Sequence, residues 1–276
     1  MIGKIVKQIS NDYTVKIGNE FRVCKARGKF RVMDITPLVG DNVHIDIKNN
    51  YILNIIDRKN SLIRPSIANV DQAVIVMSTT IPSFSLELLD RLLAITEFNN
   101  ITPIIYISKL DLLTKDEIDK IVSISHYYQK IGYKVYTDLS IKEIFKGKLT
   151  VFVGQSGAGK STLLNKLDHT LNLQTGEVSV ALGRGRHTTR HVELIGLLDG
   201  LIADTPGFSK IDFNEMSKSD IRDNFIEFNK YRNACEYKDC MHIKEENCEV
   251  KRQVGKNILA SRYNNYLKFL GVKNEE

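Results

Sequence analysis

Residues 154–161 combine three glycines with a lysine and a serine, in the order Gly-Gln-Ser-Gly-Ala-Gly-Lys-Ser, which fits the phosphate-loop pattern G-x-x-x-x-G-K-S/T. In such a loop the backbone N–H groups surround phosphates, the lysine reaches the outer phosphates and the last hydroxyl binds Mg²⁺. An apolar run at 149–153 predicts a strand before the loop, and 162–167 predicts a helix whose N-terminus attracts anions. We therefore expect nucleotide contacts from Gly154, Gln155, Ser156, Gly157, Ala158, Gly159, Lys160, Ser161 and Thr162.

A second motif lies upstream, where the predicted strand 104–107 ends in Ser108-Lys109-Leu110-Asp111. This tetrapeptide resembles the guanine-recognition motif N-K-x-D of GTPases. Asp111 would accept hydrogen bonds from guanine N1 and the exocyclic amine, and the stem of Lys109 would lie along the ring. Ser108 replaces the usual Asn, so a hydrogen bond to the base or between loops is lost and guanine affinity is expected to be modest. Because this motif precedes the phosphate loop, the order is the reverse of that in ordinary GTPases, and we predict a circularly permuted domain.

A third motif follows the apolar run 201–203, where residues 204–207 match the D-x-x-G of GTPases. We expect Asp204 and Gly207 at the phosphate end, with Asp204 reaching Mg²⁺ directly or through water. Between the phosphate loop and Asp204, residues 183–190 alternate glycines with cations and then carry paired threonines, which is typical of a mobile loop that closes on a γ-phosphate. Thr189, or alternatively Thr188, would bind Mg²⁺ together with Ser161.

Hydrolysis requires a positioned water and stabilised charge on the phosphates. Lys160 would supply much of that stabilisation. Many GTPases place a glutamine directly after D-x-x-G, but this chain has Phe208, whose apolar side chain cannot orient water. We therefore expect slow intrinsic turnover, with His187 as the candidate catalytic residue that positions water. The alternative for His187 is a contact within its loop or with RNA.

Cys235, Cys240, His242 and Cys248 lie within fourteen residues, and Cys24 is far from them. Three thiols and an imidazole are the ligand set that tetrahedral Zn²⁺ prefers, and a site closed by four protein ligands is structural. The thiols of a cytosolic chain remain reduced, which argues against disulfides. The alternative is a chance group of surface cysteines, and His242 is the ligand whose identity is least secure because only one residue separates it from Cys240.

The net charge of +6 belongs to the N-terminal segment, since residues 1–66 contain 12 Lys and Arg against 6 Asp and Glu, while the rest has 27 of each. In this segment five cations alternate with aromatic residues, as on a nucleic-acid-binding surface: Arg22, Lys25, Arg27, Lys29 and Arg31 beside Tyr13, Phe21 and Phe30. An ordinary solvated β-hairpin is the alternative. No apolar run approaches the ~18 residues of a membrane-spanning helix, and the first residues do not resemble a signal peptide, so we expect a soluble cytoplasmic protein.

Hydrophobic periodicity divides the 276 residues into three parts. Alternating runs at 13–17, 21–23, 30–32 and 43–47, separated by turn signals, indicate about five strands and a small β-barrel, for which an OB-fold is preferred and an SH3-like barrel is the alternative. Strands and helices alternate from about residue 67, and both nucleotide motifs follow strands, where an open parallel sheet places its ligand. The prediction is a multidomain α/β protein with an OB-fold at 1–66, a permuted P-loop GTPase domain at 67–211 and a helical zinc domain at 212–276.

These features together resemble the bacterial ribosome small-subunit-dependent GTPase A family over essentially the full length. The segments that carry the resemblance are G-Q-S-G-A-G-K-S-T (154–162), G-R-G-R-H-T-T-R (183–190) and D-T-P-G-F (204–208). The resemblance implies GTP hydrolysis to GDP stimulated by the small ribosomal subunit, contact with its rRNA and a part in its late maturation. We expect a monomer with no membrane or DNA partner. Two other classes remain open, an RNA-binding module or assembly chaperone that does not use turnover, and a P-loop enzyme that uses ATP.

Overall fold

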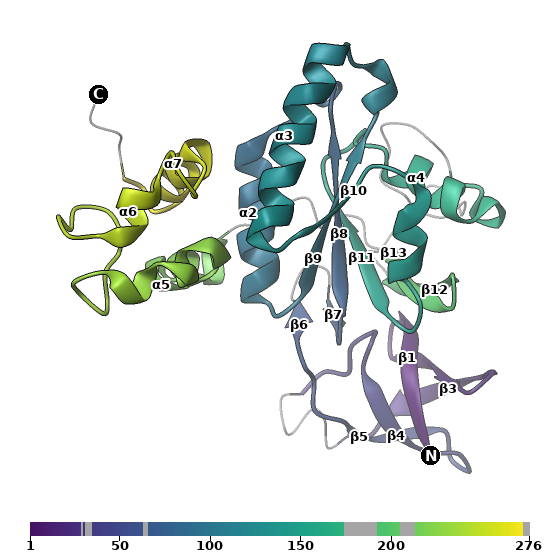
Figure 1. Ribbon diagram of the computed structural model, residues 1–276. Helices are drawn as coiled ribbons and strands as arrows, with labels where there is room; N and C mark the ends of the chain where they lie inside the picture. Colours follow the sequence, from purple (N-terminus) through teal and green to yellow (C-terminus); the bar gives the residue numbers. More distant parts are fainter. Residues whose placement is uncertain (29, 31–34, 63–65, 174–191, 205–212, 273–276) are drawn as a thin grey trace.

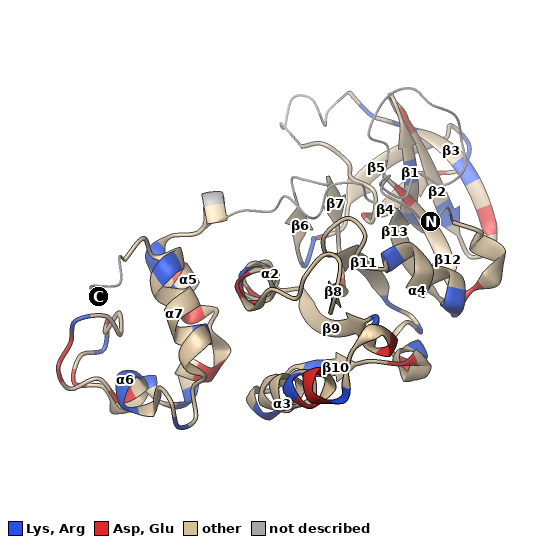
Figure 2. Ribbon diagram, turned by 90° about the horizontal axis from the view of Figure 1, so that it is seen from above, with Lys and Arg blue, Asp and Glu red and all other residues tan. Residues whose placement is uncertain are grey.

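The computed structural model describes residues 1–28, 30, 35–62, 66–173, 192–204 and 213–272. These residues form an N-terminal barrel, a central layered α/β domain and a C-terminal group of short helices (Figure 1). A view turned by 90° shows the barrel and the C-terminal helices at opposite ends, with the α/β domain between them (Figure 2). None of the helices in the described part combines the length and apolar composition needed to cross a bilayer.

The N-terminal barrel closes because β4 pairs with β1, which gives the strand order β1-β2-β3-β5-β4 and back to β1. All neighbours are antiparallel except β3 and β5. This closed five-stranded arrangement confirms the predicted OB-type barrel. Its strands are β1 (Ile2–Ile9), β2 (Asp12–Ile17), β3 (Glu20–Ala26), β4 (Asn42–Asp46) and β5 (Tyr51–Ile55).

Two details of the barrel differ from the sequence expectation. The alternating runs of the sequence omit both β1 and β5; in β1 a β-bulge between Ile5 and Lys7 breaks the alternation, so Ile5 and Val6 are both buried. The strand expected at 30–32 is wrong at Phe30, which is helical and whose ring is buried in the barrel core; residues 31 and 32 lie outside the described part. Phe30, an apolar residue in a run of cations, therefore fills the barrel core and does not belong to an alternating strand.

The central domain contains a sheet in the order β10-β9-β8-β11-β13-β12, in which only β12 is antiparallel to its neighbour. The strand that leads into the phosphate loop, β11, lies in the middle of the sheet although three strands of the domain precede it in sequence. That arrangement is the circular permutation predicted from motif order. The strands are β8 (Gln72–Ser78), β9 (Thr102–Ser108), β10 (Lys134–Tyr136), β11 (Leu149–Val153), β12 (Glu193–Leu197) and β13 (Gly200–Asp204).

Helices cover both faces of this sheet, which explains why its central strands are apolar without alternation. On β8, Ile75 packs in the cluster shared with α2 and α3, whereas Val74 packs in the cluster that contains α4. Ser85 caps the first turn of α2, and Thr114 with Glu117 forms a capping box on α3. The helices are α2 (Leu86–Phe98), α3 (Lys115–Ile131) and α4 (Lys160–Leu167).

The C-terminal unit has a small aromatic core in which Phe225, Phe228 and Tyr266 contact one another. It packs on α2, which contributes the buried Ala94 to the same cluster. Its helices are α5 (Lys218–Asp223), α6 (Glu249–Gln253) and α7 (Ala260–Phe269), with short 3₁₀ helices at Phe213–Glu215, Ile226–Lys230 and Arg232–Ala234.

The barrel joins the central domain through one strand pair and a short hairpin. Lys7 of β1 lies opposite Glu193 of β12, so the described strands of the two units form a continuous eleven-stranded sheet. The hairpin of β6 (Ser61–Leu62) and β7 (Ile67–Ala68) lies between β5 and β8 in the chain. Three further 3₁₀ helices connect elements of the central domain, at Leu110–Leu112, Leu139–Ile144 and His169–Leu171.

Candidate nucleotide site and metal centre

The phosphate loop lies between the end of β11 and the start of α4, and its backbone requires glycine at two positions. Gly154 has φ of 140°, and a Cβ there would lie 2.3 Å from the Val76 carbonyl oxygen of the neighbouring strand β8. Gly159 has φ of 97° and directly precedes the first residue of α4. The loop therefore lies against β8 and leads directly into the N-terminus of α4, the end of a helix that binds anions.

Lys160 is the first residue of α4, and its side chain folds over the loop. Its Nζ donates to the carbonyl oxygens of Gly154 and Gln155, at 2.7 Å in each case. Burial lowers the pKa of this lysine from its usual value. A charged phosphate oxygen is a stronger acceptor for an ammonium than a neutral carbonyl, so this cation is placed where a phosphate can compete for it.

The segment from Ser108 to Asp111, which the sequence predicts to recognise guanine, contacts the phosphate loop directly. The Ser108 hydroxyl donates to the Ala158 carbonyl over 2.6 Å, and Lys109 Nζ donates to the Gly157 carbonyl over 2.8 Å. Asp111 is exposed in the 3₁₀ helix that follows. Fifty residues separate Ser108 from Ala158, so the fold unites the two motifs that the sequence places apart.

Ser108 departs from the expected loss of a loop-bridging hydrogen bond. A serine hydroxyl has one proton, and here that proton bridges to the phosphate loop, although its side chain is shorter than that of asparagine. Lys109 also donates to the Ile81 carbonyl, a contact that the sequence did not indicate because a backbone carbonyl carries no residue signature. The motif is thus fixed from two sides, by the phosphate loop and by the segment after β8.

The remaining phosphate-end residues are placed only in part. β13 ends at Asp204 and runs parallel to β11, with Ala203 opposite Val151, so the backbone of Asp204 lies at the sheet edge that carries the phosphate loop. Ser161 and Thr162 lie in the first turn of α4. The candidates His187, Thr188, Thr189, Gly207 and Phe208 lie outside the described residues.

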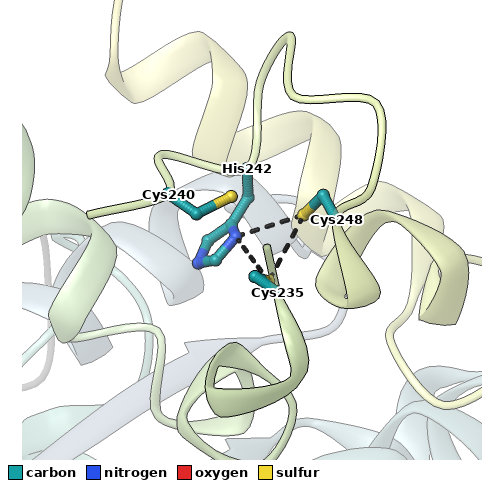
Figure 3. Close-up of side chains that lie close together, drawn as sticks. All are labelled: Cys235, Cys240, His242 and Cys248. Atoms are coloured by element: carbon teal, nitrogen blue, oxygen red, sulfur yellow. Dashed lines mark hydrogen bonds between the residues drawn. The ribbon is translucent and has the colours of Figure 1, made fainter. Parts of the chain in front are cut away.

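The four predicted metal ligands converge in the C-terminal unit (Figure 3). Their ligand atoms all lie within 4.8 Å of one another: Cys235, Cys240, His242 and Cys248. The Cys235 and Cys248 sulfurs are 3.8 Å apart, and His242 Nδ1 lies 3.7 Å from the former and 3.2 Å from the latter. Tetrahedral zinc with bonds of about 2.3 Å to sulfur separates two sulfur ligands by about 3.8 Å. The donor set and its spacing therefore fit a tetrahedral thiophilic metal.

The loop around His242 is held in place by hydrogen bonds to its backbone. His242 has φ of 59°, in the left-handed region, and its carbonyl accepts from the Tyr263 hydroxyl over 2.6 Å. Glu245 accepts from the N–H groups of Met241 and Ile243, at 2.7 and 2.8 Å. These contacts hold the loop so that the imidazole lies among the thiols. His242 therefore joins the cluster although only one residue separates it from Cys240.

Burial also sets the protonation of the cluster. It raises the pKa of Cys240 to about 12 and raises the pKa of Cys248, while it lowers the pKa of His242 to about 4. The imidazole is therefore neutral at physiological pH, as a metal ligand must be. The thiols must lose protons to bind a metal, so metal binding here releases protons and weakens as the pH falls.

The proposed nucleic-acid surface on the barrel is smaller than the sequence suggested. Tyr13 and Phe30 are not surface residues, because both rings are buried in the barrel core. On the outer face, Phe21 is 63% exposed and lies 6.0 Å from the ammonium of Lys16. Of the five predicted cations, Lys25 and Arg27 are exposed, Arg22 is partly exposed, and Lys29 and Arg31 lie outside the described residues. Val23 is also exposed, and Tyr51 pairs with Lys25.

Comparison with known proteins matches two segments of the chain to models of one family. The family model described as RsgA GTPase matches residues 55–214, and the model described as RsgA N-terminal domain matches residues 2–52. The small ribosomal subunit biogenesis GTPase RsgA of Enterococcus faecalis is 49% identical, covering 97% of this chain and 94% of the relative. RsgA of Lactococcus lactis is 48% identical, covering 97% and 93%.

Two solved structures share the whole architecture. The crystal structure of YloQ, described as a circularly permuted GTPase, has a TM-score of 0.82 and 40% identity and covers 100% of this chain and 96% of its own. YjeQ from Thermotoga maritima has a TM-score of 0.83 and 31% identity, with coverage of 100% and 99%.

Proposed function

The chain belongs to the RsgA GTPase family, and from this membership we propose that it binds the small ribosomal subunit and acts in its late maturation, hydrolysing GTP to GDP and phosphate with turnover that the subunit stimulates. Its relatives are described as small ribosomal subunit biogenesis GTPases. The observation that carries the proposal is the direct contact of Ser108 and Lys109 with the phosphate loop, because it brings the predicted guanine-recognition motif next to that loop.

Within that site each motif has a distinct task. The loop from Gly154 to Thr162 would surround the phosphates, and Lys160 would exchange its two carbonyl acceptors for phosphate oxygens. Ser161, Asp204 and Thr189 would hold Mg²⁺, which neutralises charge on the phosphates. Asp111 would accept from the two guanine donors, and Gly207 would approach the γ-phosphate.

Hydrolysis would depend on His187 to position the attacking water, since Phe208 cannot. This assignment rests on residue chemistry and sequence position alone. It accounts for slow turnover in the free protein and for stimulation on the subunit, provided that the subunit orders the loop that contains His187. His187→Ala should slow the chemical step with little change in nucleotide affinity. A large loss of GDP binding instead would show that His187 has another role.

The Cys235, Cys240, His242 and Cys248 cluster would hold a structural Zn²⁺. The donor chemistry and the spacing of the ligand atoms support zinc, and the absence of an open ligand position argues against a catalytic role. Metal analysis of the purified protein should find one zinc per chain.

Nucleotide state would be transmitted to the C-terminal unit by a short path. Phe213 follows the D-x-x-G motif by six residues, and its ring lies 4.8 Å from Phe269 of α7. The Arg91 guanidinium of α2 lies 5.9 Å from the Phe213 ring and 5.6 Å from the Phe269 ring. We propose that GTP favours the subunit-bound arrangement and that hydrolysis favours release. Equal affinity for the subunit with GDP and with a non-hydrolysable GTP analogue would exclude this switch.

The barrel and the C-terminal unit lie on different sides of the central domain (Figure 2), so both could contact rRNA at once. We retain the division 1–66, 67–211 and 212–276 as a proposal, together with a cytoplasmic monomer that has no membrane or DNA partner. Limited proteolysis followed by mass spectrometry tests the boundaries, and light scattering tests the monomer.

The central experiment measures GTP turnover with and without purified small ribosomal subunits. We expect stimulation for the natural chain and no turnover for Lys160→Ala or Ser161→Ala, and Asp111→Asn should weaken the preference for guanine. Large ribosomal subunits serve as the matched control. Turnover unaffected by small subunits would favour the RNA-binding module or assembly chaperone, and equal competition by ATP would favour the ATP-using enzyme.

A further inference from the structure

Thr79 directly follows β8. It contacts the backbone of the predicted guanine-recognition motif, which begins at the end of the neighbouring strand β9. Its hydroxyl lies 2.9 Å from the Lys109 carbonyl oxygen and 3.2 Å from the Ser108 carbonyl oxygen. Its backbone N–H donates to the Ser108 carbonyl over 3.3 Å. The sequence analysis assigned Thr79 no role, because a lone threonine after an apolar strand carries no signature.

The backbone that Thr79 contacts is strained and leads directly to Asp111. Lys109 has φ of 63°, a left-handed conformation that costs free energy for any residue with a side chain. The Lys109 carbonyl also accepts from the Leu112 N–H over 3.2 Å, which closes the 3₁₀ turn that contains Asp111. A hydrogen bond to the Lys109 carbonyl therefore helps to set the conformation of this turn, and with it the direction of the Asp111 carboxylate.

Thr79 also supplies a donor that this version of the motif lacks. The usual asparagine carries two amide protons, whereas the Ser108 hydroxyl carries one, and its shortest contact is with Ala158 of the phosphate loop. Its other contact, at 3.3 Å, is with the Met77 carbonyl, so neither acceptor of this hydroxyl belongs to the motif's own turn. The Thr79 hydroxyl reaches that turn from β8.

We propose that Thr79 is a positioning residue for guanine recognition: its hydroxyl holds the Lys109 carbonyl and so fixes the carboxylate of Asp111 for both guanine donors. This inference rests on the proposed function, in which Asp111 recognises guanine. Lys109 keeps separate side-chain contacts to Ile81 and Gly157, so loss of the Thr79 hydroxyl would leave the lysine anchored and alter the turn behind it.

The test compares the affinities of the full-length protein for GDP and for inosine diphosphate, which lacks the exocyclic amine and so measures one of the two Asp111 hydrogen bonds. Thr79→Val removes the hydroxyl while keeping the shape, and Thr79→Ser keeps the hydroxyl. We expect Thr79→Val to weaken GDP binding by about fivefold to tenfold, as the loss of one hydrogen bond implies, and to weaken inosine diphosphate binding less. Thr79→Ser should retain the natural ratio, and Thr80→Val is the neighbouring control.

A second measurement separates a local effect on guanine recognition from a general loss of structure. An unchanged ratio in Thr79→Val, or equal weakening of both nucleotides, would overturn the inference, and thermal unfolding of each variant identifies any general loss of structure. If the natural protein itself fails to prefer GDP over ADP, the proposed guanine function fails instead, so the two failures are distinguishable.

Discussion

The barrel and the C-terminal unit are attached to the central domain in contrasting ways. The barrel is held by the β1 and β12 pair, by an apolar core that it shares with the central domain, and by partly exposed ion pairs: Lys7 with Glu193 at 2.8 Å, and Lys59 with Asp71 at 2.5 Å. The C-terminal unit is held on α2 by Arg262, whose fully buried guanidinium lies 2.5 Å from Asp90 and 2.6 Å from Glu227.

The buried group is a network and not an isolated pair. Asp90 also accepts from the Tyr128 hydroxyl over 2.6 Å and from the Asn265 amide over 2.7 Å. The Arg262 guanidinium lies 4.7 Å from the Phe225 ring centre. Arg262 and Asp90 therefore each have several partners, and Glu227 accepts from two nitrogens of Arg262, which is the condition under which a buried ion pair is tolerated.

The difference predicts different mechanical roles. Exposed ion pairs contribute about 0–1 kcal/mol and are screened by salt, so these pairs add little to the strand pairing and the shared apolar core that hold the barrel. Breaking a buried pair on one side costs about 3–5 kcal/mol, so the C-terminal unit should move together with α2. Since α2 follows the segment whose Ile81 carbonyl contacts Lys109, the helix connects the nucleotide site with this unit.

Removal of the metal should give the largest loss of stability, and this loss should be confined to the C-terminal unit. Structural zinc contributes on the order of 10 kcal/mol in small zinc domains, so a chelator should unfold the C-terminal unit and leave the barrel folded. Hydrogen exchange followed by mass spectrometry would show rapid exchange in 213–272 only. Chelation should become easier as the pH falls, because protons compete for the thiolates. Uniform loss of protection in the barrel as well would contradict separate attachment.

Arg262→Met should destabilise the protein by about 3–5 kcal/mol, because it leaves the Asp90 and Glu227 carboxylates buried without their cation. Urea unfolding measures the change. Arg252→Met is the matched control, since Arg252 is an exposed partner of Glu249 in the same unit and should change stability by less than about 0.5 kcal/mol. Similar unfolding midpoints for both variants would show that the buried network does not anchor the unit.

Arg91→Ala should cost about 1 kcal/mol, the scale of a partly desolvated cation–π contact, because it removes the guanidinium beside Phe213 and Phe269. Arg91→Ala should also weaken the coupling between the bound nucleotide and subunit affinity. The difference in small-subunit affinity between GDP and a GTP analogue should narrow, while GDP affinity stays unchanged. A preserved nucleotide effect would mean that coupling does not pass through this contact.

Lys7→Ala should give the smallest effect, a loss of less than about 1 kcal/mol, because Lys7 and Glu193 are 24% and 47% exposed. The loss should disappear at high salt, where the pair is already screened. Denaturant unfolding at two salt concentrations measures both. A salt-independent loss as large as that of Arg262→Met would remove the contrast between the two attachments.

Much of the candidate site was predictable because its chemistry is local. The phosphate loop needs glycines and a lysine within eight residues, and the metal cluster needs three cysteines and a histidine within fourteen, so both patterns survive in the sequence itself. The prediction of a barrel and a permuted domain was confirmed for the same reason, since strand periodicity and motif order are local properties. The β-bulge in β1 and the burial of Tyr13 and Phe30 were missed because bulges and core positions depend on partners elsewhere in the chain.

The sequence alone therefore determined which chemical groups this protein has and in what order it presents them. Only the tertiary structure decided which groups meet: Ser108 with Ala158, Thr79 with Lys109, and Asp90 with Arg262 across 172 residues. The physical reason is that a hydrogen bond or ion pair between distant residues depends on how strands and helices pack, and a backbone carbonyl or a single buried charge leaves no pattern along the chain by which its partner could be found.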